Sequence, residues 1–248
     1  MLDFEVFKGF NFEYPPVGVK FSMTKPGDLP LLTKKHAICE MLREAQLSEG
    51  GFYAAYDNHN CKVGPYILGQ IGREPGIVGG QIGPRLGVYQ DARANRQIYL
   101  DMPRLDEGTG SYTWFSKLDG ISFDPDIIIL TAKPSQAEIV LRAKGYRSGK
   151  GWNARGTSVA GCASLYTYPY LSGDMNMMVT GLHHGMKVRE IFPEGLLFLS
   201  IPFQLIPEII SNLKEMQWNL PQYSWGREQH LKRMKEIGQE IAAEMKNN

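Results

Sequence analysis

The stretch Phe123–Ala143, FDPDIIILTAKPSQAEIVLRA, decides the fold that we predict for this chain. Within it, Ile127–Thr131 is a continuous aliphatic run, which is typical of a strand that is buried on both faces of a sheet. Pro134 suits the first turn of a helix, and the apolar residues after it continue to Gly145, where the helix is expected to end. The stretch therefore predicts a core strand followed by a helix that packs beside it.

The same order of strand, proline and helix returns later in the chain. Leu196–Ile201 (LLFLSI) is a second aliphatic run, and Pro202 precedes a helical pattern of apolar residues that ends at Leu213. Helical patterns alternate with strand patterns through the rest of the sequence. We therefore predict the α/β class, with a single domain that has a mixed sheet, aliphatic central strands and flanking helices.

The two ends of the chain are predicted to differ in role. Near the start, residues 15–23 (PPVGVKFSM) alternate like a half-buried strand, and Thr33 can cap a helix that runs to about Leu47. We expect one α/β domain over residues 1–220 and a long amphipathic helix within 221–248. One stripe of this helix is apolar and favours packing on the domain or on a partner subunit, which would form a homo-oligomer. Its members are Leu231, Met234, Ile237, Ile241 and Met245.

Composition excludes several functional classes. The 248 residues contain 27 Lys and Arg against 26 Asp and Glu, for a net charge of +1, and no basic cluster predicts nucleic-acid binding. The longest aliphatic runs are far shorter than a membrane span, so we expect no membrane association. The N-terminus has no basic and apolar segments of a secretory signal. These features predict a cytoplasmic protein.

Two segments are predicted to enclose a binding pocket. Trp152–Gly185 is rich in aromatic, sulfur-bearing and imidazole side chains, and residues 64–87, beginning at Gly64, carry eight glycines that allow close approach of a ligand. Neither segment holds a phosphate-binding glycine motif. We expect a small molecule between them, with Tyr168 and Tyr170 as ring walls and Asn176 as a bidentate amide that acts on ligand retention rather than stability.

The cysteines are the strongest candidates for chemistry. There are three, Cys39, Cys61 and Cys162, and an odd number fits a reducing compartment better than a secreted protein. Cys61 comes just before a predicted helix start, where backbone N–H groups favour a thiolate. The alternative is that each cysteine is a small buried hydrophobic residue.

Taken together, several motifs resemble one known family. They are PPVGVKF, the helix and turn that hold the first two cysteines, FDPDIIILTAKPSQAEIVLRA, GCASLYTYPYLSGDMNMMVTGLHHGMKV and GLLFLSIPFQLI. Over about residues 15–213 the chain resembles the uncharacterised archaeal and bacterial family known as domain of unknown function 169. Its motif positions match Cys39, Cys61, Cys162, Pro169, Tyr170 and Asn176. The resemblance implies a shared fold and no established activity.

The matched cysteines lead to one functional prediction and two alternatives. Three thiolates suit a soft metal, so we predict an iron–sulfur cluster held by Cys39, Cys61 and Cys162, with zinc as second choice. His183 is favoured over His184 as a fourth or outer ligand. An open metal position would activate a small substrate as a Lewis acid. The alternatives are thiol chemistry without metal, and ligand binding without catalysis.

Overall fold

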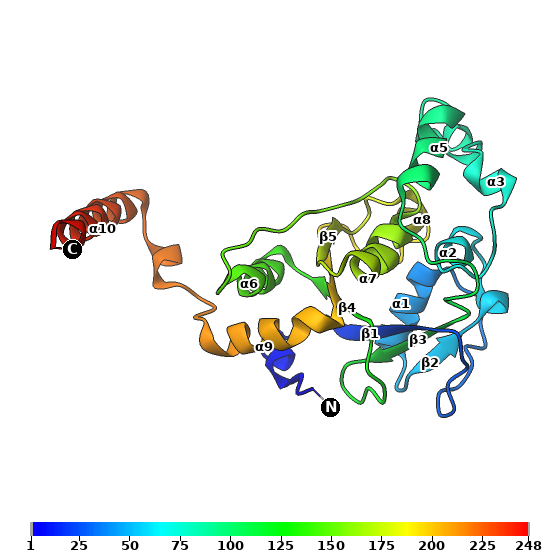
Figure 1. The fold of residues 1–248 in the computed structure, drawn as a ribbon, viewed down its shortest axis with the longest axis horizontal. Helices are drawn as coiled ribbons and strands as arrows, with labels where there is room; N and C mark the ends of the chain where they lie inside the picture. The colour runs from blue at the N-terminus through cyan, green and yellow to red at the C-terminus, as the bar shows by residue number, and fades with distance from the viewer. Residues whose placement is uncertain (1, 248) are drawn as a thin grey trace. The chain divides into compact units, whose positions relative to one another are not determined.

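The computed structural model describes residues 2–247, and these form two compact units, Met1–Lys214 and Glu215–Asn248. The division falls between Lys214 and Glu215, whereas the sequence places the end of the domain at residue 220. The first unit carries a six-stranded sheet (Figure 1). The second unit is dominated by one long helix. The α/β class and the C-terminal helix are therefore confirmed.

The sheet has the strand order β2-β3-β1-β4-β6-β5. Its members are β1 (Tyr14–Ser22), β2 (Phe52–Ala54), β3 (Tyr112–Lys117), β4 (Ile127–Ala132), β5 (Asn176–Val179) and β6 (Leu197–Pro202). All pairings between these strands are antiparallel. The sequence predicts a mixed sheet, but the six strands are all antiparallel. Among residues 2–247, parallel pairing occurs in the isolated bridges Leu31–Tyr53 and His36–His59.

Strand β4 lies inside the sheet as its aliphatic composition requires. Every residue from Ile127 to Ala132 is buried. Ile129 faces Val17 of β1 on one side and Ser200 of β6 on the other. A strand that is covered on both faces selects an uninterrupted apolar run, because no side of it meets water. The two aliphatic runs of the sequence are thus neighbouring strands at the centre of the core.

Helices and short helical turns connect the strands. The helices are α1 (Ile38–Leu47), α2 (Val63–Ile67), α3 (Pro75–Val78), α4 (Ile82–Arg85), α5 (Ala92–Asp101), α6 (Pro134–Gly145), α7 (Tyr168–Ser172), α8 (His184–Lys187), α9 (Ile206–Glu215) and α10 (Arg227–Asn247). The turns are η1 (Glu5–Phe10), η2 (Tyr56–Asn58), the π-helical η3 (Ala163–Thr167), η4 (Phe203–Leu205) and η5 (Pro221–Ser224).

Helix α1 starts later than the sequence predicts. Thr33 was the expected cap, but the helix begins at Ile38. The reason is Glu40, whose carboxylate accepts a hydrogen bond from the backbone N–H of Ala37 at 2.6 Å. This reach back from the first turn satisfies a donor that the helix itself cannot pair. The late start places Cys39 in the first turn of the helix.

The segment around Cys162 is helical but not regular. The chain is helical from Gly161, turns into the π-helix η3 directly after Cys162, and continues as α7. The sequence Tyr168-Pro169-Tyr170 opens α7. Proline is tolerated at this position because a helix leaves its first N–H groups unpaired. His183 and His184 follow β5, which ends at Val179, and His184 begins α8.

The second unit presents an unburied apolar stripe on α10. Leu231, Met234, Ile241 and Met245 are exposed, and Arg233 of the same helix pairs with Glu240 at 2.8 Å. Within residues 2–247, no helix combines the length and the apolar character that a membrane crossing requires.

Candidate functional site

A cavity of about 490 Å³ collects the cysteines of this chain. Cys39, Cys61 and Cys162 all line it, and so do His183 and Gly64. Its walls come from residues 61–64 and 77–86 on one side and from residues 159–162 and 183–189 on another. Both segments that the sequence analysis names as enclosing a pocket, 64–87 and Trp152–Gly185, contribute lining residues, together with residues 37–39, Asn95 and Tyr99. We refer to it as the cysteine cavity.

Cys39 and Cys61 approach the cavity from adjacent parts of the fold. Cys39 is buried in the first turn of α1, and burial raises the pKa of its thiol to about 12, with the nearby charge of Arg189 opposing that rise. Cys61 is half-buried and precedes α2 by two positions. In the metal-free protein the Cys39 thiol is therefore protonated at neutral pH, and Cys61 is the more accessible of the two.

Cys162 lies where the backbone is least regular. Ala160, two positions before it, has φ 56° in the left-handed region, and the π-helix begins just after it. Surrounding protein raises the pKa of the Cys162 thiol well above its usual value, although part of the side chain stays accessible through the cavity. Left-handed non-glycine residues and π-turns both occur often at functional sites.

His183 contributes a buried and unpartnered imidazole. Its side chain is 2% exposed, and neither ring nitrogen makes a hydrogen bond in the structure. Burial lowers the pKa of His183, while the backbone of Thr157 lies close enough to oppose part of that fall. The ring is thus neutral near pH 7, the form in which an imidazole can bind a metal or accept a proton.

The ring of His183 rests on a glycine. A Cβ atom placed on Gly161 would come within 2.0 Å of His183 Nδ1, so this position accommodates the imidazole only without a side chain. Gly161 and His183 therefore pack against each other at the cavity wall.

Asn95 is a lining residue that the sequence did not reveal. It lies on α5, is 1% exposed, and donates from Nδ2 to the carbonyl of Gly80 at 3.0 Å. Its Oδ1 has no hydrogen-bond partner in the structure. Buried polar atoms are nearly always paired, so an unpaired one beside a cavity points to a ligand or solvent donor. An asparagine within a polar helical segment gives no signal for such a role in the sequence.

The other predicted binding residues do not line the cysteine cavity. Tyr168 lines a separate cavity of about 430 Å³, and Tyr170 is 41% exposed with its ring against Phe21. Asn176 is 1% exposed, and its amide bonds the backbone N–H and carbonyl of Arg155 and the carbonyl of Ser164. Its polar atoms are thus already occupied within the protein.

The donor set suits a soft metal, yet it is not arranged for a single ion. Across residues 2–247, no group of three or more His, Cys, Asp or Glu side chains is positioned to hold one metal ion. Ligands of a single ion must all lie near about 2.3 Å from one centre. The cavity therefore brings the three cysteines to one space without presenting a site for a single ion.

The fold and the site together define an antiparallel α/β protein with a thiol-lined cavity. Its family model match extends over residues 8–212, and the chain belongs to the DUF169 family, described as uncharacterised ArCR. A similar curated protein is an uncharacterised protein of Methanocaldococcus jannaschii, 26% identical over 208 residues that cover 82% of this chain and 88% of that protein. No solved structure is significantly similar to the chain.

Proposed function

We propose that the protein holds a thiophilic metal centre in the cysteine cavity, with an iron–sulfur cluster as first choice and zinc as second. The observation that supports this is the meeting of Cys39, Cys61 and Cys162, which are far apart in the sequence, at one cavity. Sulfur ligands favour iron–sulfur clusters and other soft metals. Such a centre fits a reducing, cytoplasmic setting.

The rest of the cavity supports a small substrate beside the metal. Three thiolates leave one metal position for another ligand, and an open position can polarise a substrate as a Lewis acid. His183 is the protein side chain that can occupy or border this position, because both of its nitrogens are unpartnered. The volume of about 490 Å³ is within the range of small-molecule pockets.

Metal analysis of protein purified without oxygen tests the proposal. We expect iron with acid-labile sulfide, or else zinc, in stoichiometric amount. Each of Cys39→Ser, Cys61→Ser and Cys162→Ser should reduce it, and His183→Gln should reduce it less. His230→Gln, which changes an exposed histidine of α10, is the matched control and should retain the wild-type content. Metal-free wild-type protein would refute the proposal.

Thiol chemistry without metal is the second candidate. It is favoured by the finding that no group of three or more ligand side chains within residues 2–247 is set for a single ion. Burial raises the pKa of Cys39 and of Cys162, so Cys61 should be the nucleophile. Mass spectrometry after brief iodoacetamide treatment of the native, metal-free protein should find label on Cys61 first. Equal labelling of all three cysteines would contradict this candidate.

A further inference from the structure

The charged side chains that line the cysteine cavity are all basic. Lys62 and Arg189 line it, and none of its described lining residues is Asp or Glu. Lys62 is paired with Glu74, which does not line the cavity. The cation that remains for a ligand is therefore Arg189, and a single guanidinium suits a ligand with one negative charge.

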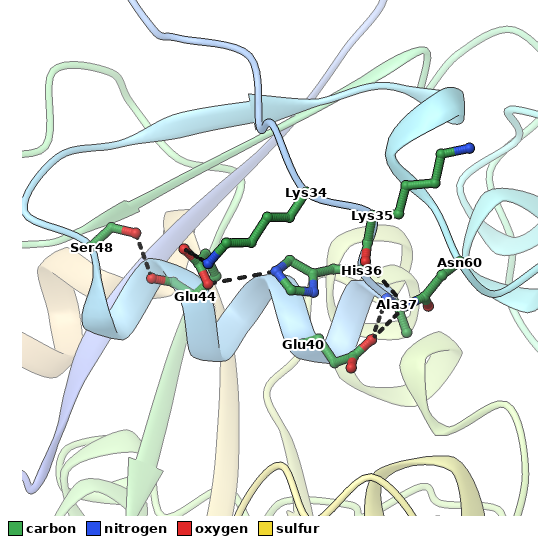
Figure 2. A network of polar contacts seen from close by, with 8 residues as sticks. All are labelled: Lys34, Lys35, His36, Ala37, Glu40, Glu44, Ser48 and Asn60. Carbon is green, nitrogen blue, oxygen red and sulfur yellow. Dashed lines mark hydrogen bonds and ion pairs between the residues drawn. The ribbon is translucent and has the colours of Figure 1, made fainter.

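Arg189 is held in place by one hydrogen bond and one long ion pair. Its Nη1 donates to the carbonyl of Gly185 at 2.9 Å, and its Nε lies 3.8 Å from Glu40 Oε2. The same Glu40 oxygen accepts shorter bonds from the N–H of Ala37 at 2.6 Å and from Asn60 Nδ2 at 3.2 Å (Figure 2). Because Glu40 Oε2 already accepts these shorter bonds at the start of α1, it lies far from Arg189 Nε. The guanidinium therefore keeps N–H donors that can bind another carboxylate.

Apolar side chains at the cavity are left open to solvent. Ile82, Leu86 and Val188 line it and are 46%, 48% and 61% exposed. Apolar residues that are gathered around a concave site are typical of a surface that a ligand covers. Asn95 and His183, whose side chains carry unpartnered polar atoms, line the same cavity, and both side chains are at least nine-tenths buried. These buried atoms independently indicate that the cavity is built for a ligand.

We infer that the cysteine cavity binds a small organic carboxylate with an apolar body, whose charged end is recognised by Arg189. The apolar part lies against Ile82, Leu86 and Val188, and the carboxylate pairs with the guanidinium. A phosphate ester fits less well, since it carries more charge than one guanidinium balances and the chain has no phosphate-binding glycine motif. Only one part of the inference, that the carboxylate lies beside a metal centre, rests on the proposed function.

Isothermal titration calorimetry with three probes of equal chain length tests the inference. Hexanoate should bind the full-length protein at least about tenfold more tightly than hexanamide, because a charge-assisted pair with arginine is worth about that much. Hexylamine, which is cationic at pH 7, should bind least. This comparison uses the wild-type chain, so it does not depend on any variant folding. Equal binding of hexanoate and hexanamide, or no binding of any probe, would overturn the inference.

A pair of arginine variants locates the effect. Arg189→Met keeps most of the apolar side chain and should reduce hexanoate binding to the hexanamide level. Arg85→Met is the matched control, because Arg85 also donates to a carbonyl four residues earlier, that of Gln81, but does not line the cavity. It should leave the preference for hexanoate intact. Unchanged hexanoate binding in Arg189→Met would also overturn the inference.

The same titrations separate this inference from the proposed metal centre. They are run on oxygen-free protein as isolated and after chelation, with metal content measured on both samples. If the protein as isolated carries no metal and still prefers hexanoate, the proposed function alone is refuted. Metal-loaded protein that does not distinguish the probes refutes the inference alone.

Discussion

Replacing Gly161 with alanine should destabilise the protein through His183. The new Cβ would come within 2.0 to 2.2 Å of three imidazole atoms, a distance at which the ring must move. Overpacking a buried position costs about 1 to 3 kcal/mol. Gly161 is helical, and alanine in a helix gains up to about 1 kcal/mol over glycine, so with the full gain the net loss should be about 0 to 2 kcal/mol.

Urea unfolding at equilibrium, followed by tryptophan fluorescence, measures this loss. Gly76→Ala is the control, because Gly76 is also helical, in α3, and a Cβ there would meet nothing within 4 Å. The control should be neutral or slightly stabilising. In a His183→Ala background the clash is absent, so Gly161→Ala should lose its cost, and the double-mutant cycle should give a coupling equal to the overpacking cost, about 1 to 3 kcal/mol.

The reasoning is refuted if Gly161→Ala costs as much without the His183 ring as with it. It is also refuted if Gly161→Ala stabilises the protein as Gly76→Ala does. A metal measurement adds a second readout, because displacing the imidazole should lower metal retention in the folded variant even where the unfolding free energy changes little.

Three further predictions follow from other parts of the structure. Asn176→Ala should cost about 2 to 3 kcal/mol in urea unfolding, since the buried Asn176 amide loses three hydrogen bonds to the backbone of Arg155 and Ser164. An unchanged unfolding midpoint would instead favour a role in ligand binding. Burial raises the pKa of Asp126, so ionisation of this carboxyl group lowers the stability of the fold as pH rises through that pKa. The free energy of unfolding of Asp126→Asn should therefore increase relative to that of the wild type between pH 3 and neutrality. A difference in unfolding free energy that does not change with pH contradicts this. Leu231→Glu with Ile241→Glu should reduce the mass in light scattering to the monomer, 27.9 kDa, and a wild type already at that mass contradicts oligomerisation through α10.

The core strands were predictable because burial on both faces requires a run of apolar residues, which can be recognised within one short segment of sequence. Ile127–Ala132 is buried throughout, and only an uninterrupted apolar run meets that condition. Strand β3 gave no such signal, although Thr113 and Phe115 are buried. Its half-buried positions include Tyr112 and Trp114, so the alternation of apolar and polar residues is missing. Pairing with β1 and β2, which depends on the whole fold, makes this segment a strand.

The candidate site was predictable in its location and only partly in its members. Glycine density and clustered sulfur and imidazole groups pointed to the segments that enclose the cavity. Gly161, Asn95 and Arg189 gave no signal in the sequence, because the role of each depends on tertiary structure. Gly161 matters because the ring of His183 packs on it, and Asn95 because its buried Oδ1 has no partner. Arg189 matters because its partner Glu40 also binds other groups. Asn176 stood out in the sequence, but its amide is occupied by backbone that only the tertiary structure brings near.

The position of β5 has a consequence for the order in which the site can form during synthesis. β5 is an edge strand of the sheet, and its only strand neighbour in the order, β6, is made after it. Residues 159–162 and 183–189, which flank β5, line the cavity. This wall has no strand partner to anchor it until Leu197–Pro202 has left the ribosome. A centre bound by Cys162 would therefore be inserted into an almost finished unit, unlike the metals of zinc fingers, around which the chain folds.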